Sequence, residues 1–220
     1  MNDPVTCANA IRLHDVSLRL GERWALARLD LEVEAGSSLL LMGDNGAGKT
    51  TLLKVMATLL QPTAGRLELF GALVTRGTAA EVRARVGLMS HATHLYDAQT
   101  GRESLRFAAA AMGRARAPRI EALLDWVGLT AHAERPVRTY SAGMKRRLMM
   151  ARLMLKQPTI ALLDEPWSEL DSEATALLDA MVRDLHNAGA TVIIATHDVE
   201  HARSLCQASV RLQRGRRVDA

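Results

Sequence analysis

The stretch Gly43-Asp-Asn-Gly-Ala-Gly-Lys-Thr50 decides the fold. It satisfies the pattern G-x-x-x-x-G-K-[ST], which chance would produce in only about one of a hundred chains of this length. The apolar run Ser37–Met42 comes before it, and the helix-period segment Thr51–Leu60 comes after it. In such a strand, loop and helix, glycines let backbone N–H groups converge on phosphate oxygens at the start of the helix. We therefore expect a phosphate-binding loop made of Gly43, Asp44, Asn45, Gly46, Ala47, Gly48, Lys49, Thr50 and Thr51.

Two side chains of this loop have the chemistry that a triphosphate requires. Lys49 would reach the β- and γ-phosphates as a point charge, and the hydroxyl of Thr50 is a hard oxygen ligand for Mg²⁺. The alternative is a glycine-rich turn that contains a lysine by coincidence. The flanking strand and helix argue against that alternative.

Polar side chains also follow two apolar strands further along the chain. The segment Ile160-Ala-Leu-Leu-Asp-Glu-Pro166 places two carboxylates at a strand end, where open parallel sheets bind ligands. We expect Asp164 to hold Mg²⁺ through water and Glu165 to polarise the water that attacks the γ-phosphate. His197, at the second strand end, can bond the γ-phosphate and keep this water aligned. Taken alone, the acidic pair would also suit an exposed turn.

The order of the predicted elements indicates an α/β fold with a mainly parallel core sheet. Rough apolar alternation in Ile11–Leu18 and Trp24–Val33 predicts an antiparallel N-terminal β subdomain. Residues from about 95 to 156 are rich in alanine and arginine and have helical periodicity, which predicts an inserted α-helical subdomain. The other predicted elements are strands at Arg66–Phe70, Ile160–Leu163 and Thr191–Ala195, a helix at Glu173–Asn187 and a hairpin of Ser209–Gln213 with Arg217–Val218.

Length and composition fit one such domain. The 220 residues, 48% of them hydrophobic, can bury one substantial core. We expect a single domain over 1–220, in which 1–90 and 157–220 form the nucleotide-binding core with its β subdomain and 91–156 form the helical subdomain. The apolar runs fall short of the roughly 20 residues that span a bilayer, and no leader segment is evident, so we expect a cytoplasmic chain. Cys7 and Cys206 are too few for a disulfide framework or a metal cluster.

The charge of the chain leaves several partners open. A formal net charge of +4 and a pI near 9.5 suit phosphates, nucleic acid or lipid head groups without choosing among them. Aromatic residues make up only 3% of the chain, which argues against platforms that stack single-stranded nucleic acid.

Five features, in their order and spacing, closely resemble the nucleotide-binding subunit of ABC transporters over nearly the whole chain. They are the phosphate loop, Ser141-Ala-Gly-Met144, Leu162-Leu-Asp-Glu-Pro166, Ser168-Glu-Leu-Asp171 and His197. The resemblance implies the ABC ATPase fold, which is a P-loop NTPase fold, with ATP and Mg²⁺ as cofactors. It implies ATP hydrolysis coupled to transport, integral-membrane subunits on separate chains, and a peripheral position on the cytoplasmic side of the membrane.

The resemblance also implies a head-to-tail homodimer that forms on ATP binding. Each ATP would lie between the phosphate loop of one subunit and the signature motif of the other. Here the hydroxyl of Ser141, the N–H of Gly143 and the helix N-terminus would make an anion site for the twin's γ-phosphate. For Arg146 and Arg147, on the same predicted helix, contact with a ligand and solvation of the helix surface are equally open.

Several positions depart from the family pattern. Ala142 and Met144 replace a glycine and the glutamine of the common signature. Leu20 stands where an aromatic residue usually stacks on adenine, so stacking would pass to Trp24 or be weak. His91 stands where a glutamine usually reaches Mg²⁺ and the attacking water. Because imidazole is a poorer ligand for Mg²⁺, we expect His91 to take part in catalysis by hydrogen-bonding water or phosphate.

Two segments narrow the resemblance further. Gly87–Tyr96 and Tyr140–Arg147, together with the short chain, are similar to the ATP-binding subunit of the haem exporter of cytochrome c biogenesis, so haem is the first expectation for the cargo. The ATPase subunit of a drug or lipid exporter is the alternative. A soluble ABC ATPase acting on nucleic acid would suit the basic pI, but such proteins usually carry two cassettes or a long coiled-coil insertion. No nucleic-acid partner is therefore expected.

Overall fold

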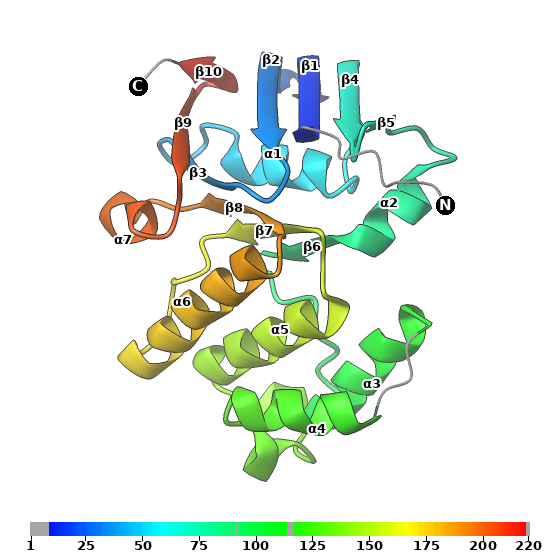
Figure 1. The fold of residues 1–220 in the computed structure, drawn as a ribbon, viewed down its shortest axis with the longest axis vertical. Helices are drawn as coiled ribbons and strands as arrows, with labels where there is room; N and C mark the ends of the chain where they lie inside the picture. The colour runs from blue at the N-terminus through cyan, green and yellow to red at the C-terminus, as the bar shows by residue number, and fades with distance from the viewer. Residues whose placement is uncertain (1–8, 91, 114–116, 219–220) are drawn as a thin grey trace.

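The computed structural model describes residues 9–90, 92–113 and 117–218, which form two β-sheets and their covering helices (Figure 1). The strands are β1 (Asn9–Leu20), β2 (Arg23–Glu34), β3 (Ser38–Met42), β4 (Ala64–Leu69), β5 (Ala72–Leu73), β6 (Val86–Met89), β7 (Ile160–Asp164), β8 (Thr191–Ala195), β9 (Ala208–Gln213) and β10 (Arg216–Val218). The α-helices are α1 (Lys49–Met56), α2 (Ala79–Arg85), α3 (Gly101–Ala111), α4 (Ala117–Trp126), α5 (Ala142–Lys156), α6 (Ser172–Asn187) and α7 (Val199–Arg203). Two short 3₁₀ turns, Thr130–His132 and Val137–Thr139, precede α5.

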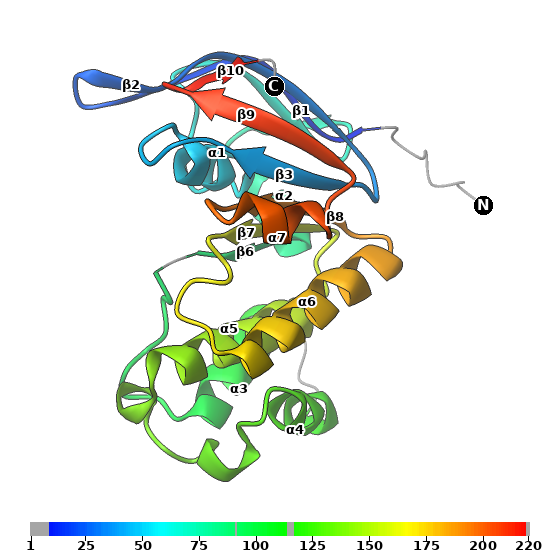
Figure 2. The ribbon, with the colours of Figure 1, turned by 90° about the vertical axis from the view of Figure 1, so that its left-hand side faces the viewer.

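The two sheets have different strand orientations. The six-stranded sheet has the order β10-β9-β3-β8-β7-β6, and all of its pairs are parallel except β10 with β9. The four-stranded sheet, β2-β1-β4-β5, is antiparallel throughout. Helix α1 lies between the two sheets, and α3 to α6 lie beyond the opposite face of the six-stranded sheet (Figures 1 and 2). This is the predicted fold class, and it is confirmed.

The unbroken apolar runs of the central strands are explained by burial on both faces. In β7, Ile160 and Leu162 pack with α1 and the antiparallel sheet, whereas Ala161 and Leu163 pack with α5 and α6. Successive side chains of a strand point to opposite faces, so a strand covered on both sides needs apolar residues at every position. Full burial of each leucine or isoleucine contributes roughly 1.5–3 kcal/mol.

Strand register places the predicted site residues along one edge. Leu41 of β3 and Asp164 of β7 both pair with Ala195 of β8. The three strands therefore end at the same level, and the phosphate loop, the acidic pair and His197 each follow one of these ends. Parallel pairing thus gathers residues that are far apart in the sequence.

The predicted elements are present, with shifted ends and some additions. The helix expected at Thr51–Leu60 begins at Lys49 and ends at Met56. Helices α2 and α7 and strand β6 were not predicted. Helices α3 to α5 lie between β6 and β7 in the chain and occupy the lower part of Figure 1, while the subdomain boundaries remain a prediction. In the described part of the chain, no helix combines the length and apolar character needed to cross a membrane.

Candidate active site

The phosphate loop joins β3 to α1 through backbone that glycine adopts most readily. Gly43 and Gly48 have φ angles of 147° and 108°. A Cβ on Gly48 would lie 2.7 Å from the carbonyl oxygen of Ala25, and a Cβ on Gly43 would collide with the carbonyl oxygen of Leu212. The loop is therefore pressed against β2 and β9, and side chains at these two glycines would displace it.

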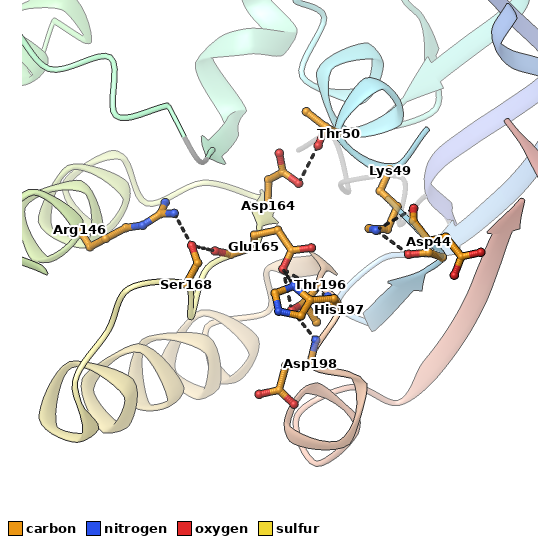
Figure 3. A network of polar contacts seen from close by, with 11 residues as sticks. Asp44, Lys49, Thr50, Arg146, Asp164, Glu165, Ser168, Thr196, His197 and Asp198 are labelled. Carbon is orange, nitrogen blue, oxygen red and sulfur yellow. Dashed lines mark hydrogen bonds and ion pairs between the residues drawn. The ribbon is translucent and has the colours of Figure 1, made fainter. Parts of the chain in front are cut away.

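The ammonium group of Lys49 lies within this loop. The residue is only 7% exposed, and its Nζ donates to the carbonyl oxygens of Gly43 at 2.6 Å and Asp44 at 3.3 Å (Figure 3). The outer part of the loop, 44–46, is exposed. A positive charge, an exposed glycine-rich turn and the start of a helix thus lie together, and this arrangement fits a phosphate group.

Thr50 and Asp164 form a pair of hard oxygen atoms. The Thr50 hydroxyl donates to Asp164 Oδ1 at 3.1 Å, and Asp164 is only 3% exposed at the end of β7 (Figure 3). Burial raises the pKa of the Asp164 carboxyl, and the hydrogen bond from Thr50 opposes this shift. No cluster of three or more His, Cys, Asp and Glu side chains suited to a metal occurs among the described residues. Two oxygen atoms of this kind fit a hard cation such as Mg²⁺.

Hydrogen bonds hold both the backbone and the side chain of Glu165. Its φ of 47° is unusual for a residue other than glycine, and its N–H donates to Ala195 O at 2.7 Å. Its Oε2 accepts from the Thr196 hydroxyl at 3.0 Å and lies 2.8 Å from His197 Nδ1 (Figure 3). The structure thus brings together the glutamate and histidine that the sequence assigned to hydrolysis. The two side chains touch directly.

The predicted signature motif lies at the N-terminus of α5. Ser141 caps this helix, and its Oγ accepts from the N–H of Met144 at 3.1 Å. A Cβ on Gly143 would meet no atom closer than Ser141 Oγ, at 3.9 Å, so this helix tip is open. Within the described residues, no hydrogen bond joins Ser141 or Gly143 to the phosphate loop or to Glu165. Their use by a twin subunit remains a prediction.

The structure gives no polar contact for the predicted roles of Trp24 at adenine and of His91 in catalysis among the residues that it describes. Trp24 is 54% exposed on the β1–β2 hairpin, where Leu20 is also exposed. An exposed indole is available for stacking, but the role of Trp24 stays a prediction. His91 lies outside the described residues.

Three further residues around Glu165 had no predicted role in hydrolysis. For one of them, Arg146, the sequence left solvation of the helix surface open; the residue is only 2% exposed, so that interpretation is wrong. Thr196 is 1% exposed and bonds the Glu165 carboxylate. Ser168 donates from its hydroxyl to the Glu165 carbonyl oxygen at 2.9 Å, and Arg146 donates to Ser168 Oγ at 2.8 Å. Thr196 comes directly before His197, so its position at a strand end was an available signal. The contact of Arg146 with Ser168 had no such signal in the sequence.

A phosphate loop between strand and helix, a threonine paired with a strand-end aspartate, and a glutamate beside a histidine form a candidate nucleotide site of the kind expected in an ATP-binding cassette. The ABC transporter family matches residues 26–168. The chain belongs to this family.

Similar proteins agree with this assignment. The daunorubicin resistance ATP-binding protein DrrA3 of Streptomyces coeruleorubidus is 40% identical over 89% of this chain and 63% of its own length. The Nod factor export ATP-binding protein I of Cupriavidus metallidurans is 33% identical over 94% of this chain and 69% of its own length. A solved ATP-binding subunit of an ABC transporter is 28% identical, with a TM-score of 0.87 over 94% of this chain and 88% of the solved chain. The chain thus spans less than two thirds of the length of DrrA3 and slightly more than two thirds of the length of the Nod factor export protein.

Proposed function

We propose that this chain binds ATP with Mg²⁺, hydrolyses the ATP, and acts as the ATP-binding subunit of an ABC exporter. The observation that carries the proposal is the meeting of three strand ends at one sheet edge, which gathers Lys49, Asp164 and Glu165 (Figure 3). Family membership supports the same conclusion.

In the proposed reaction, water attacks the γ-phosphate and ADP leaves. Glu165 accepts a proton from the attacking water, while Thr196 and His197 orient its carboxylate. Lys49 places positive charge beside the β- and γ-phosphates. Thr50 and Asp164 would hold Mg²⁺, which when bound neutralises charge on the phosphate oxygens.

The active state in this proposal is a homodimer. Ser141 is exposed and Gly143 is half-buried at the tip of α5, which carries partial positive charge from the helix dipole. Such a tip suits the γ-phosphate of an ATP held by the phosphate loop of a second copy. Each ATP would then be bound by both chains, so nucleotide binding would drive dimerisation.

The proposed surface for the membrane subunits is a groove next to the end of β6. The groove, of about 360 Å³, is lined by residues of β6, α3 and α5. Phe107 lines the groove and is 49% exposed, and its ring meets that of Tyr96, which is 60% exposed, edge to face with 5.5 Å between the ring centroids. Arg83 and Arg152 also line the groove, so a loop with apolar and acidic side chains would complement it. Binding there would hold the chain peripherally on the cytoplasmic side of the membrane.

The comparisons favour one cargo class among those the sequence left open. Two relatives carry the names of Nod factor export and daunorubicin resistance. These names favour a drug or lipid exporter over haem export. Haem remains the second candidate because Gly87–Tyr96 and Tyr140–Arg147 resemble the haem exporter subunit.

ATP turnover by the purified chain, with and without Mg²⁺, tests the proposed activity. Polypeptides that co-purify from membranes would identify the partner subunits. In the reconstituted complex, we expect turnover to rise with daunorubicin or a lipid and not with haemin. Stimulation by haemin alone would reverse the order of the two cargo candidates. Stimulation of the isolated chain by nucleic acid would contradict the transport function.

A further inference from the structure

Arg146 is a buried charged residue that joins three segments of the chain. It lies on α5, is only 2% exposed, and donates from Nη1 to the carbonyl oxygen of Ser90 at 2.9 Å. Its Nη2 donates to Ser168 Oγ at 2.8 Å (Figure 3). Ser90 follows β6 at the edge of the core sheet, and Ser168 lies in the turn after Glu165. One guanidinium therefore connects the signature helix to the end of β6 and to the turn after Glu165.

Ser168 passes this connection to the backbone of Glu165. Its hydroxyl accepts from Arg146 and donates to the Glu165 carbonyl oxygen at 2.9 Å. Its N–H lies 3.3 Å from the same carbonyl oxygen. The φ of 47° at Glu165 is unfavourable for a residue other than glycine, so this conformation persists only where its surroundings hold it.

The neighbouring arginine makes a different set of contacts. Arg147 pairs with Asp171 at 3.5 Å and with Glu173 at 3.1 Å, and these carboxylates are 67% and 83% exposed. The Arg147 side chain itself is 14% exposed, so its partners face solvent while its stem is largely covered. Arg146 is itself buried, and it donates to two neutral oxygen atoms; burial lowers the pKa of its guanidinium, and the charges of Glu169 and Asp164 oppose that shift. A buried charge of this kind is poorly explained by stability alone.

We propose that Arg146 is a positioning residue for ATP hydrolysis. Through Ser168 it holds the Glu165 backbone in the conformation that aims the carboxylate, and through Ser90 it ties the same helix to the end of β6. Because Ser141 begins this helix, the signature tip and the catalytic base of one chain are linked as a unit. The inference rests on the proposed ATPase function and assigns Arg146 a task within it.

Steady-state kinetics of four variants test the proposal, with melting temperatures and calorimetric ATP affinities measured in parallel. Arg146→Met keeps the approximate side-chain length and removes every donor, so kcat should fall by about 10–100-fold, since small misplacements of reacting groups cost that much. KM and ATP affinity should change by less than about 3-fold, because the phosphate loop is intact. Arg146→Lys retains one donor head and should recover part of kcat. The control Arg147→Met should stay within about 2-fold of wild type.

The fourth variant, Ser168→Ala, tests the route of the effect. It should lower kcat, and adding it to Arg146→Met should cause little further loss, since both changes break one connection. Unchanged kcat in a folded Arg146→Met protein, or fully multiplicative effects in the double variant, would overturn the proposal. If Arg146→Met does not fold, unchanged kcat in Ser168→Ala overturns it. Absence of turnover in wild type would instead overturn the proposed function, and this inference with it.

Discussion

The two ends of the proposed ATP site are built in different ways. At the sheet edge, Lys49 and Glu165 are each held by several hydrogen bonds within one chain. At the tip of α5, Ser141 bonds only the start of its own helix among the contacts described for its side chain, and a Cβ on Gly143 would meet only Ser141 Oγ, at 3.9 Å. The first region is complete in a single copy. Among the described residues, the second region has no hydrogen bond to the phosphate loop or to Glu165, which is why we assign its function to a dimer.

Glu165→Gln should have the largest effect on turnover. It removes the base but keeps the side-chain size, so kcat should fall by roughly 10²–10⁴-fold while ATP still binds. ATP should then accumulate a dimer, detectable by size-exclusion chromatography. Turnover close to wild type would remove Glu165 from the role of base. A monomer at saturating ATP would contradict the shared site.

Lys49→Ala should weaken nucleotide binding at the sheet edge and leave the tip of α5 unchanged. Loss of the buried ammonium should weaken ATP affinity by about 100-fold, as measured by calorimetry on the monomer. Lys54→Ala, a lysine change on the same helix, serves as the control. Tight binding by Lys49→Ala would contradict the assigned phosphate loop.

Gly143→Asp should separate the two regions most clearly. A Cβ fits there, and a carboxylate in the first turn stabilises a helix by roughly 0.3–1 kcal/mol, so the melting temperature should not fall. The same charge should repel the twin's γ-phosphate and lower turnover by about 10-fold or more. Gly143→Asn is the neutral control.

Mixing Gly143→Asp protein with Lys49→Ala protein sharpens this test. A mixed dimer would contain one intact composite site, because each variant supplies what the other lacks. Turnover should return on mixing, and its failure to return in a confirmed mixed dimer would place both regions on the same chain's ATP.

Ser141→Ala should have a smaller effect. It removes a helix cap, at a cost of about 1 kcal/mol, together with one contact to the twin's ATP, so turnover should fall by a few-fold. Thr100→Ala is the matched control, because Thr100 caps α3 in a capping box. It should lose similar stability and keep its turnover. Equal turnover losses in both variants would reduce Ser141 to a structural cap.

Asp164→Asn should show how much the buried Asp164 carboxylate at the sheet edge destabilises the fold. Burial raises the pKa of Asp164 in the folded chain, so the folded state binds this proton more tightly than the unfolded state. The stability contributed by the group is therefore lost as pH rises through its folded pKa, and at pH 7 the buried carboxylate destabilises the fold. Without Mg²⁺ and ATP, the variant should melt at a higher temperature than wild type at pH 7, with a smaller difference in acid.

Asp30→Asn is the control of opposite sign. Asp30 accepts a hydrogen bond from the Asp15 N–H, which lowers the pKa of the Asp30 carboxyl. The stability that the Asp30 carboxylate contributes to the fold is present at neutral pH and lost as pH falls through its folded pKa. This variant should therefore not melt at a higher temperature than wild type at pH 7. A higher melting temperature would remove the sign argument for Asp164.

The helices and strands that the sequence predicted are those whose burial produces a clear hydrophobic pattern along the chain. Strands β7 and β8 are buried on both faces, and their apolar runs predicted them directly. Strand β6 was missed because it has only four residues, and α2 because only Ala79 and Val82 of its seven residues are buried. Short elements of this kind are positioned by the sheet they join, so their own sequence carries a weak signal.

The sequence alone determined the chemistry of the sheet edge. A phosphate loop depends on glycines and a lysine at fixed spacing, and strand ends place Asp164, Glu165 and His197 by local rules. Tertiary structure alone decided what holds these groups in place. Arg146 reaches Ser90 across 56 positions and Ser168 across 22. A side-chain bond over such separations depends on how α5 packs against the sheet, which spacing along the chain does not encode.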